Sequence, residues 1–321
     1  MYDLIIIGGG AASQAAAMYA IGKQINFLMI YDVLGGRVGE RYVMRTEEDV
    51  PVGQILVHFE SVDEVEKEDH LVGSEAVHLF EKYIMEQQGH LLKDHVNSVT
   101  KTDAGFTIET ANNGAQQSKA VIVATGDHTK PLNIPGKEFL IEGLGYSSAA
   151  HAEMLQGKKA AVFGITERAL HGTAELAHTT SMVYLVAPEP VKSTPIVQAL
   201  KMRADVEILE GYTLKEAVGS NKQIQAIVVE KNGETRRLEV DVAFVAQALI
   251  PNSDMVKNLV ETDTEGFIKV DERNATNVPG IFAAGEVTTD YGREVLIAIG
   301  EGARAALSAH DYLLALPALK S

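Results

Sequence analysis

The first thirty residues place a glycine turn between a buried strand and a buried helix, and this order constrains the fold more than any other feature. The run Leu4–Ile7 is continuously apolar, which is typical of a parallel strand covered on both faces. Gly8-Gly9-Gly10 follows it, and the Ala-rich stretch Ala11–Ile21 predicts a buried helix. A second apolar run, Ile25–Tyr31, completes a βαβ unit. The sequence therefore predicts an α/β fold built on a parallel sheet.

The turn itself has the spacing Gly8-x-Gly10-x-x-Ser13. Glycines at such positions allow a tight turn and let backbone N–H groups approach a pyrophosphate at the positive end of the helix, which Ala11 and Ala12 open. Ser13 replaces the usual third glycine and is still small enough for helix–strand packing. The alternative is a strand–helix turn that binds nothing. Asp32, after the second strand, could accept hydrogen bonds from an adenosine ribose or be a solvated turn residue.

A second βαβ unit follows later in the chain. It consists of the strand Ala160–Phe163, the helix Ala169–Ala177 and the strand Met182–Ala187. The loop-rich stretch Leu132–Gly145 between the two units suggests a domain boundary, and a chain of 321 residues is long enough for two domains. Further strands are expected at 222–229, 237–245 and 281–284, and a last helix at 295–314.

Composition excludes several function classes. The 321 residues contain no cysteine, which excludes disulfides, dithiol redox chemistry, thiolate nucleophiles and iron–sulfur ligation. Lys and Arg number 28 against 44 Asp and Glu, a formal net charge of −16, which argues against nucleic acid and membrane surfaces as partners. No targeting or membrane-spanning segment is visible and the histidines lack metal-ligand spacing, so we expect a cytoplasmic protein without a metal site. The acidic segment Ser61–His70 is expected to be exposed.

Four further motifs occur in a fixed order. These are GGRV at Gly35–Val38, VIVATG at Val121–Gly126, PGIFAAGEV at Pro279–Val287, and REV at Arg293–Val295 followed by GEGARAAL. Together with the N-terminal YDLIIIGGGAAS, they resemble the thioredoxin reductase-like flavoproteins, a family whose members have two dinucleotide-binding domains. The resemblance covers nearly the whole chain and is weakest over residues 40–75.

The resemblance implies a specific architecture. Two Rossmann-like three-layer domains are expected, the second inserted into the first. Residues 1–128 and 242–321 would form the FAD-binding domain, and residues 129–241 an NAD(P)-binding-like domain. It also implies a homodimer.

The resemblance also implies which residues hold FAD. The family's acid on the ribityl chain matches Glu286, where the family usually has Asp, and Glu294 stands where it usually has Gln. The helix beginning near Arg293 would aim its N-terminus at the flavin. The expected FAD-binding residues are Gly8, Gly10, Ala11, Ala12, Asp32, Gly35, Gly36, Arg37, Ala124, Thr125, Gly126, Gly285, Glu286, Arg293, Glu294 and Val295.

One departure from the family concerns the redox-active CxxC pair. The corresponding segment is Tyr146–Gln156, with Ala149 and Ala152 in the nearest register. The chain therefore cannot be an ordinary thioredoxin reductase, and it is similar in this respect to ferredoxin–NADP reductases of the same fold. His151 in this segment is a candidate proton shuttle near the flavin, and the alternative is a surface or domain-interface histidine.

Other departures concern the nicotinamide cofactor. Thr166 replaces the middle glycine of the second turn, where a Cβ obstructs the pyrophosphate. Ala187-Pro188-Glu189-Pro190 stands where the family has arginines for the NADP 2′-phosphate, and Ala248 replaces a glycine. NADH is thus the nicotinamide nucleotide that could bind, and NADPH is disfavoured.

Three hypotheses for function follow. The first is an electron-transfer oxidoreductase of the ferredoxin–NAD(P) reductase kind, whose flavin exchanges electrons with an external partner. The second is a flavoprotein that has lost nicotinamide use and takes electrons from a protein donor such as a ferredoxin. The third is a non-catalytic FAD-binding protein.

Overall fold

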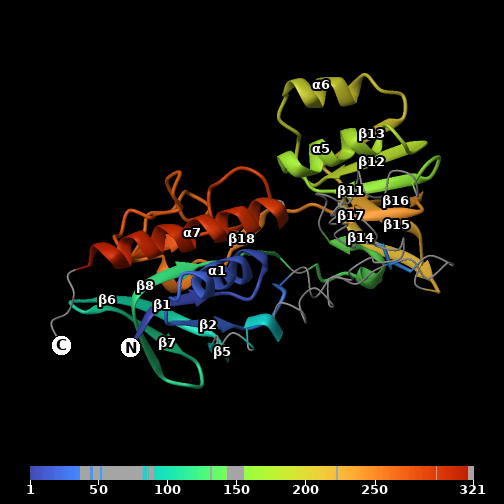
Figure 1. Ribbon diagram of the computed structural model, residues 1–321. Coiled ribbons are helices and arrows are strands. Elements are labelled where there is room, and N and C mark those ends of the chain that lie inside the picture. The colour runs from blue at the N-terminus through green and yellow to red at the C-terminus, as the bar shows by residue number, and fades with distance from the viewer. Residues whose placement is uncertain are drawn as a thin grey trace, which may run out of the picture. The chain divides into compact units, whose positions relative to one another are not determined.

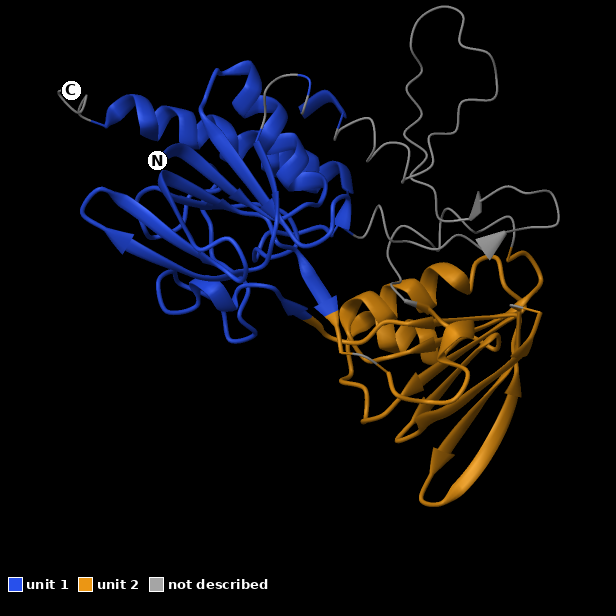
Figure 2. Cartoon of the chain, turned by 90° about the horizontal axis from the view of Figure 1, so that it is seen from below, with its two compact units in different colours: residues 1–128, 250–321 blue, residues 129–249 orange. Residues whose placement is uncertain are grey.

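The computed structural model describes residues 1–36, 44–45, 51–52, 82–84, 86, 90–130, 132–142, 155–221, 223–293 and 295–316. The chain forms two compact units, residues 1–128 with 250–321 and residues 129–249 (Figure 2). The chain enters the second unit at the end of strand β9 (Asp127–Thr129) and leaves it within β18 (Leu249–Pro251), and these two strands pair.

Unit 1 is built on a seven-stranded sheet in the order β5-β2-β1-β8-β7-β6, with β19 also paired to β8. The strands β5, β2, β1, β8 and β19 are mutually parallel, whereas β7 and β6 form an antiparallel extension. Its elements are β1 (Tyr2–Ile7), α1 (Ala11–Gly22), β2 (Phe27–Tyr31), β3 (Met44–Arg45), β4 (Pro51–Val52), β5 (His90–Lys93), β6 (Val96–Thr102), β7 (Gly105–Thr110), β8 (Ala115–Val123), the short helix η2 (Asp254–Val256), β19 (Ile281–Ala283) and α7 (Val295–Ala315).

Both faces of this sheet are buried, as the continuous apolar run of β1 predicts. Leu4 and Ile6 face the layer formed by α1 and α7, whereas Ile5 and Ile7 face a second core that includes residues of β6, β7 and η2. The helices α1 and α7 pack against each other on the first face (Figure 1). A Cβ added to Gly302 of α7 would lie 2.0 Å from the carbonyl oxygen of Ala12, so this glycine allows the two helices to touch through their backbones.

Unit 2 has a five-stranded parallel sheet in the order β10-β17-β11-β12-β13 and a separate antiparallel sheet β14-β15-β16. The helices α5 and α6 cover one face of the parallel sheet, and the antiparallel sheet covers the other. Its elements are η1 (Lys137–Phe139), β10 (Ile141–Glu142), β11 (Lys159–Phe163), α5 (Glu167–Leu176), β12 (Met182–Ala187), α6 (Pro195–Lys201), β13 (Val206–Glu210), β14 (Thr213–Ser220), β15 (Gln223–Lys231), β16 (Glu234–Glu239) and β17 (Val242–Val245).

The structure corrects one predicted element. The strand expected at 237–245 is two strands in two different sheets, β16 in the antiparallel sheet and β17 in the parallel sheet. The chain bends at Asp241, whose N–H donates to the carbonyl of Lys159 and whose carboxylate accepts from the N–H of Lys159. Because β17 pairs with β11, the compact unit extends to residue 249, whereas the sequence placed the return to the first domain at residue 242.

Two absences concern the described residues alone. Among them, no helix is long and apolar enough to cross a membrane. The same residues contain no group of His, Asp and Glu side chains that could hold a metal ion.

Candidate cofactor site

The three glycines after β1 serve different purposes. Gly8 has φ +128°, and a Cβ there would lie 2.2 Å from the carbonyl oxygen of Ala124. A Cβ on Gly9 would lie 2.2 Å from the carbonyl oxygen of Val33. Gly10 has an ordinary φ of −78°, and a Cβ there would meet nothing within 4 Å. Backbone packing therefore requires the first two glycines, whereas the third keeps a space beside the helix terminus open.

That space lies at the N-terminus of α1. Gly10 is the N-cap residue and supplies no side-chain cap, and the first turn of α1 has no acidic residue. The first backbone N–H groups of a helix have no partner within the helix and carry its positive partial charge. An FAD pyrophosphate fits this terminus, because a backbone approach of this kind needs the room that a Cβ at Gly10 would take.

Ser13, at the third position of the motif, is accommodated by a hydrogen bond. Its hydroxyl donates to the carbonyl oxygen of Ala124 at 3.1 Å and is fully buried. Gln14, also buried, donates from Nε2 to the carbonyl oxygen of Gly9 at 3.1 Å. These two polar side chains tie α1 to the turn that precedes it and to the end of β8.

Gly35 and Gly36 are brought onto the same turn. The N–H of Gly35 donates to the carbonyl of Gly9 at 2.7 Å, and a Cβ on Gly36, where φ is +51°, would lie 3.1 Å from the Cα of Gly10. The structure thus places the second glycine pair against the first. Arg37 lies outside the described residues.

Asp32 ends β2 at the carboxyl edge of the sheet, and it has a partner that sequence analysis did not anticipate. Nδ1 of His95 lies 2.9 Å from Oδ2 and 3.2 Å from Oδ1 of Asp32. His95 follows β5, the strand that pairs with β2. Both side chains are more than half exposed, so the carboxylate stays accessible from solvent.

Asp94 fixes the backbone beside His95. Its carboxylate accepts from the N–H of His95 and from the backbone and side-chain amides of Asn112 and Asn113, at 2.7–3.0 Å. Burial would raise the pKa of Asp94, but the hydrogen bonds from Asn113 and Asn112 hold that pKa well below its ordinary value. The β5–β6 turn and the loop between β7 and β8 are thereby joined.

The Ala124-Thr125-Gly126 turn follows β8, and its polar groups point to Asn252. Thr125 Oγ1 donates to the carbonyl of Asn252 at 2.5 Å, and Asn252 Nδ2 returns a bond to the carbonyl of Thr125 at 2.9 Å. The N–H of Asn252 donates to the carbonyl of Gly126. Asn252 therefore holds the turn against the start of the C-terminal segment, a role that sequence analysis missed.

The Gly285-Glu286 turn follows β19. Gly285 has φ +76°, and a Cβ there would lie 3.2 Å from the Cβ of Ala12 in the first turn of α1. The turn expected to contact the ribityl chain therefore packs directly beside the turn expected to hold the pyrophosphate. Val295 begins α7, and Glu294 lies outside the described residues.

Arg293 has a structural role. Its guanidinium pairs with the fully buried carboxylate of Asp127, donates to the carbonyl of Glu286 at 3.0 Å and lies 4.4 Å from the ring centroid of Phe267. The sequence grouped Arg293 with the cofactor contacts. In the structure its guanidinium holds the loop that carries Glu286.

Glu301 is a buried acid that sequence analysis did not single out. It lies in α7 with 3% of its surface exposed, and its Oε2 accepts from the N–H of Gly285 at 2.6 Å. Burial raises the pKa of Glu301 above its ordinary value. The signal in the sequence was an acid between Gly300 and Gly302 in an otherwise apolar helix.

The corresponding turn in unit 2 is built differently. Gly164 has φ +143°, and a Cβ there would lie 2.3 Å from the carbonyl of Ala246, so the strand–turn–helix geometry is kept. Thr166 is the N-cap of α5, and its hydroxyl accepts from the N–H of Ala169 and donates to the carbonyl of Ala246. Glu167 adds an exposed negative charge in the first turn. The terminus that is open in α1 is capped by its own side chain in α5.

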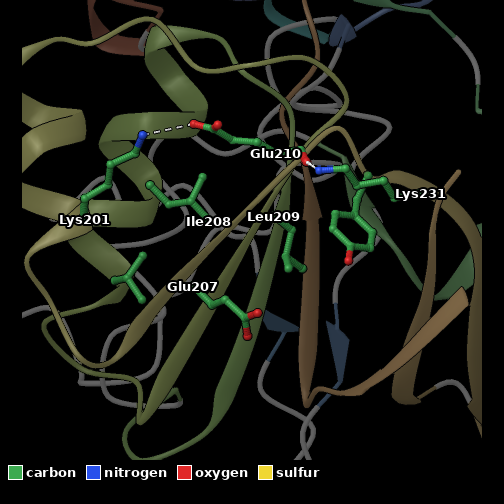
Figure 3. A pocket seen from close by; sticks show the side chains of 8 residues that line it. Lys201, Glu207, Ile208, Leu209, Glu210 and Lys231 are labelled. Carbon is green, nitrogen blue, oxygen red and sulfur yellow. Dashed lines mark hydrogen bonds and ion pairs between the residues drawn. The ribbon is translucent and has the colours of Figure 1, made fainter. Parts of the chain in front are cut away.

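A hollow of about 430 Å³ in unit 2 runs along β13 (Figure 3). Its charges are paired with other groups of the chain: Lys201 Nζ lies 3.1 Å from Glu210 Oε1, and Lys231 donates to the carbonyl of Glu210 at 2.8 Å (Figure 3). We assign no ligand to it. His151, Tyr146 and the acidic segment 61–70 lie outside the described residues.

Residues 2–302 match the family model described as pyridine nucleotide-disulphide oxidoreductase. The chain belongs to this family. Its members are flavin-dependent oxidoreductases, so the predicted enzyme class and the resemblance to thioredoxin reductase-like flavoproteins are confirmed at the level of the family. Membership implies FAD and a nicotinamide cofactor, and it leaves the choice between NADH and NADPH open.

Among curated family members, the chain is similar to a flavin-dependent component of alkyl hydroperoxide reductase. It is 32% identical to this protein of Staphylococcus aureus strain MRSA252 over 323 residues, covering 98% of this chain and 59% of that one. The Staphylococcus epidermidis RP62A protein of the same name is 30% identical over 321 residues, with the same coverage of each chain. The chain thus spans about three fifths of the length of these relatives.

Solved structures of the family confirm the predicted fold class. Thioredoxin reductase from Streptococcus pyogenes MGAS5005 superimposes with a TM-score of 0.82 at 23% identity, covering 98% of this chain and 99% of that one. Thioredoxin reductase from Giardia duodenalis gives 0.82 at 22% identity, with the same coverage. At these identities the likeness concerns the fold alone.

Proposed function

We propose that the protein is an FAD-dependent oxidoreductase that holds FAD in unit 1 and exchanges electrons with an external partner. The observation that carries this proposal is the N-terminus of α1, where Gly8 and Gly9 are fixed by backbone packing and Gly10 leaves an uncapped, open helix end. When bound, FAD supplies the capacity to accept and donate a hydride or single electrons. The chain supplies binding, orientation and electrostatics.

Within this proposal the described residues divide the work. The backbone N–H groups at Gly10, Ala11 and Ala12 would hold the pyrophosphate. Asp32, kept in place by His95, would accept hydrogen bonds from the adenosine ribose, and Glu286 would contact the ribityl chain. Gly35 and Gly36 would shape the same cradle through their packing on Gly9 and Gly10.

The electron partner is proposed to be a separate redox protein. The 321 residues contain no cysteine, so they cannot pass electrons through a dithiol of their own. Relatives named as alkyl hydroperoxide reductase and thioredoxin reductase support a protein partner, and a ferredoxin-like protein is one that a thiol-free chain could use. A homodimer in the cytoplasm remains our expectation from the family resemblance.

A second candidate function is an FAD enzyme that does not use a nicotinamide nucleotide. Thr166 favours it, because the hydroxyl caps the N-terminus of α5 where a dinucleotide pyrophosphate would otherwise take the N–H groups. The exposed carboxylate of Glu167 in the same turn repels a phosphate. The exposed Glu189, after β12, takes the place of a cation for the NADP 2′-phosphate and disfavours NADPH further.

The deciding experiment is an anaerobic titration of the purified protein with NADH and then NADPH, following the flavin absorbance. Protein that is colourless and does not take up added FAD would refute the proposed function. Reduction by NADH at micromolar concentration would establish a nicotinamide-dependent reductase and reject the second candidate. A bound flavin that ignores both nucleotides but is reduced by a reduced ferredoxin would establish the second candidate.

A further inference from the structure

Buried side chains hold the backbone turn after β19 on both sides. Asn274, which is fully buried, donates from Nδ2 to the carbonyl of Ala283 at 2.9 Å and accepts from Nε of Arg304 at 2.7 Å. Glu301 accepts from the N–H of Gly285 at 2.6 Å. Because Arg304 and Glu301 lie on neighbouring positions of α7, one helix face fixes the backbone from Ala283 to Gly285.

The carboxylate of Glu301 also lies against the first turn of α1. Gly285, which it binds, packs on the Cβ of Ala12, and Gly302, the next residue of α7, packs on the carbonyl of Ala12. Ala12 is the second residue of α1, whose N-terminus forms the open cradle at Gly10. The buried acid and the candidate pyrophosphate site therefore share the same helical turn.

The surroundings of Glu301 favour its neutral form. Burial is the largest cause of its raised pKa, and the carboxylates of Asp290 and Glu286 raise that pKa further. The N–H of Gly285 and the guanidinium of Arg304 act in the opposite direction. The facing helix α1 contains no charged residue, so its contribution is limited to the partial charge of its N-terminus.

We propose that Glu301 is a positioning residue for FAD, which fixes the Gly285-Glu286 turn and takes up a proton when FAD binds. The inference rests on the proposed function. A bound pyrophosphate brings negative charge to the turn that Glu301 packs against, and like charges disfavour the ionised carboxylate. Because linkage is reciprocal, protonation of Glu301 must then strengthen FAD binding, and FAD affinity must fall as the pH rises.

The test measures FAD dissociation constants of flavin-free protein by fluorescence, from about pH 5 to about pH 9. For the wild-type protein we expect Kd to rise with pH, by up to about tenfold per pH unit between the pKa values of Glu301 in the free and FAD-bound states. Calorimetry in two buffers of different ionisation enthalpy should show proton uptake on binding within that window. Glu301→Gln keeps an acceptor for Gly285, so it should bind FAD with a flatter pH profile and without that proton uptake.

Two further variants separate positioning from general stability. Glu301→Ala removes the acceptor and should weaken FAD binding about tenfold or more, the cost of leaving a buried N–H without its partner. Glu272→Ala changes an exposed glutamate and should match the wild-type protein throughout. If Glu301→Ala does not fold, as judged by thermal unfolding, Glu301→Gln carries the test alone.

The outcomes distinguish the two proposals. Identical pH profiles and identical proton uptake for the wild-type protein and Glu301→Gln would overturn the role of Glu301. Failure of the wild-type protein to bind FAD at any pH would instead overturn the proposed function, and the role of Glu301 with it.

Discussion

Gly10→Ala separates a cofactor cradle from an ordinary tight turn. Gly10 has φ −78° and ψ −172°, a conformation that alanine adopts without strain, and the added methyl group would meet no atom within 4 Å. A turn that binds nothing should therefore tolerate the change. A pyrophosphate cradle should not, because the methyl group enters the space through which the ligand approaches the backbone N–H groups.

The expected magnitudes follow from this geometry. In the flavin-free protein, replacing glycine by alanine at an N-cap costs on the order of 0.5–1 kcal/mol of unfolding free energy. The reduced freedom of the unfolded chain returns about 0.4–1 kcal/mol, so the net change should be near zero. In the FAD complex, losing one hydrogen bond to a charged group costs about 1.5–3 kcal/mol. This corresponds to FAD binding that is weaker by about tenfold to about a hundredfold.

Gly22→Ala is the matched control. Gly22 is the last residue of the same helix, and a Cβ there also meets nothing within 4 Å. The same chemical change should leave FAD affinity unaltered and should raise helix stability by about 0.5–1 kcal/mol.

The assay pairs FAD titration with urea unfolding of the flavin-free protein. Gly10→Ala should unfold near the wild-type midpoint and bind FAD more weakly, whereas Gly22→Ala should bind FAD as tightly as the wild-type protein and unfold at a slightly higher urea concentration. Unchanged FAD affinity in Gly10→Ala would refute the assignment of the α1 N-terminus as the cradle. A large loss of stability without FAD would refute the claim that the space beside Gly10 is free.

Three further predictions concern the second unit, the Asp94 network and the Arg293 ion pair. Thr166→Gly removes the cap of α5 and should strengthen NADH binding by about tenfold in the flavin-reduction titration, whereas Thr166→Ser keeps the hydroxyl and should not. Asp94 has a lowered pKa in the folded state, so its stabilising effect is present above about pH 3.9, the unfolded value, and is lost as the pH falls below it. Urea midpoints measured through this range should therefore depend less on pH in Asp94→Asn. Arg293→Met leaves the buried carboxylate of Asp127 without its ion-pair partner and should cost about 3 kcal/mol in chemical denaturation. The double variant with Asp127→Asn should recover part of that loss, and equal losses in both proteins would contradict the pairing.

Local sequence patterns were sufficient to predict much of the fold. The apolar runs of β1 and β12 and the Ala-rich helix α1 correspond to the predicted ranges within two residues, because burial on both sides of a sheet leaves a continuous apolar signal. The strand expected at 237–245 was wrong in one respect, since no local signal shows that successive strands belong to different sheets.

The sequence alone determined the glycine turn, the absence of a dithiol and the replacement of a glycine by Thr166, since each depends on residue identity at a fixed spacing. Only the tertiary structure decided that Gly10 faces open space and that Arg293 is committed to Asp127. It also decided that Glu301 is buried on Gly285, and that His95 holds Asp32. These contacts join residues far apart in the chain, and their geometry is set by how strands and helices pack rather than by local sequence.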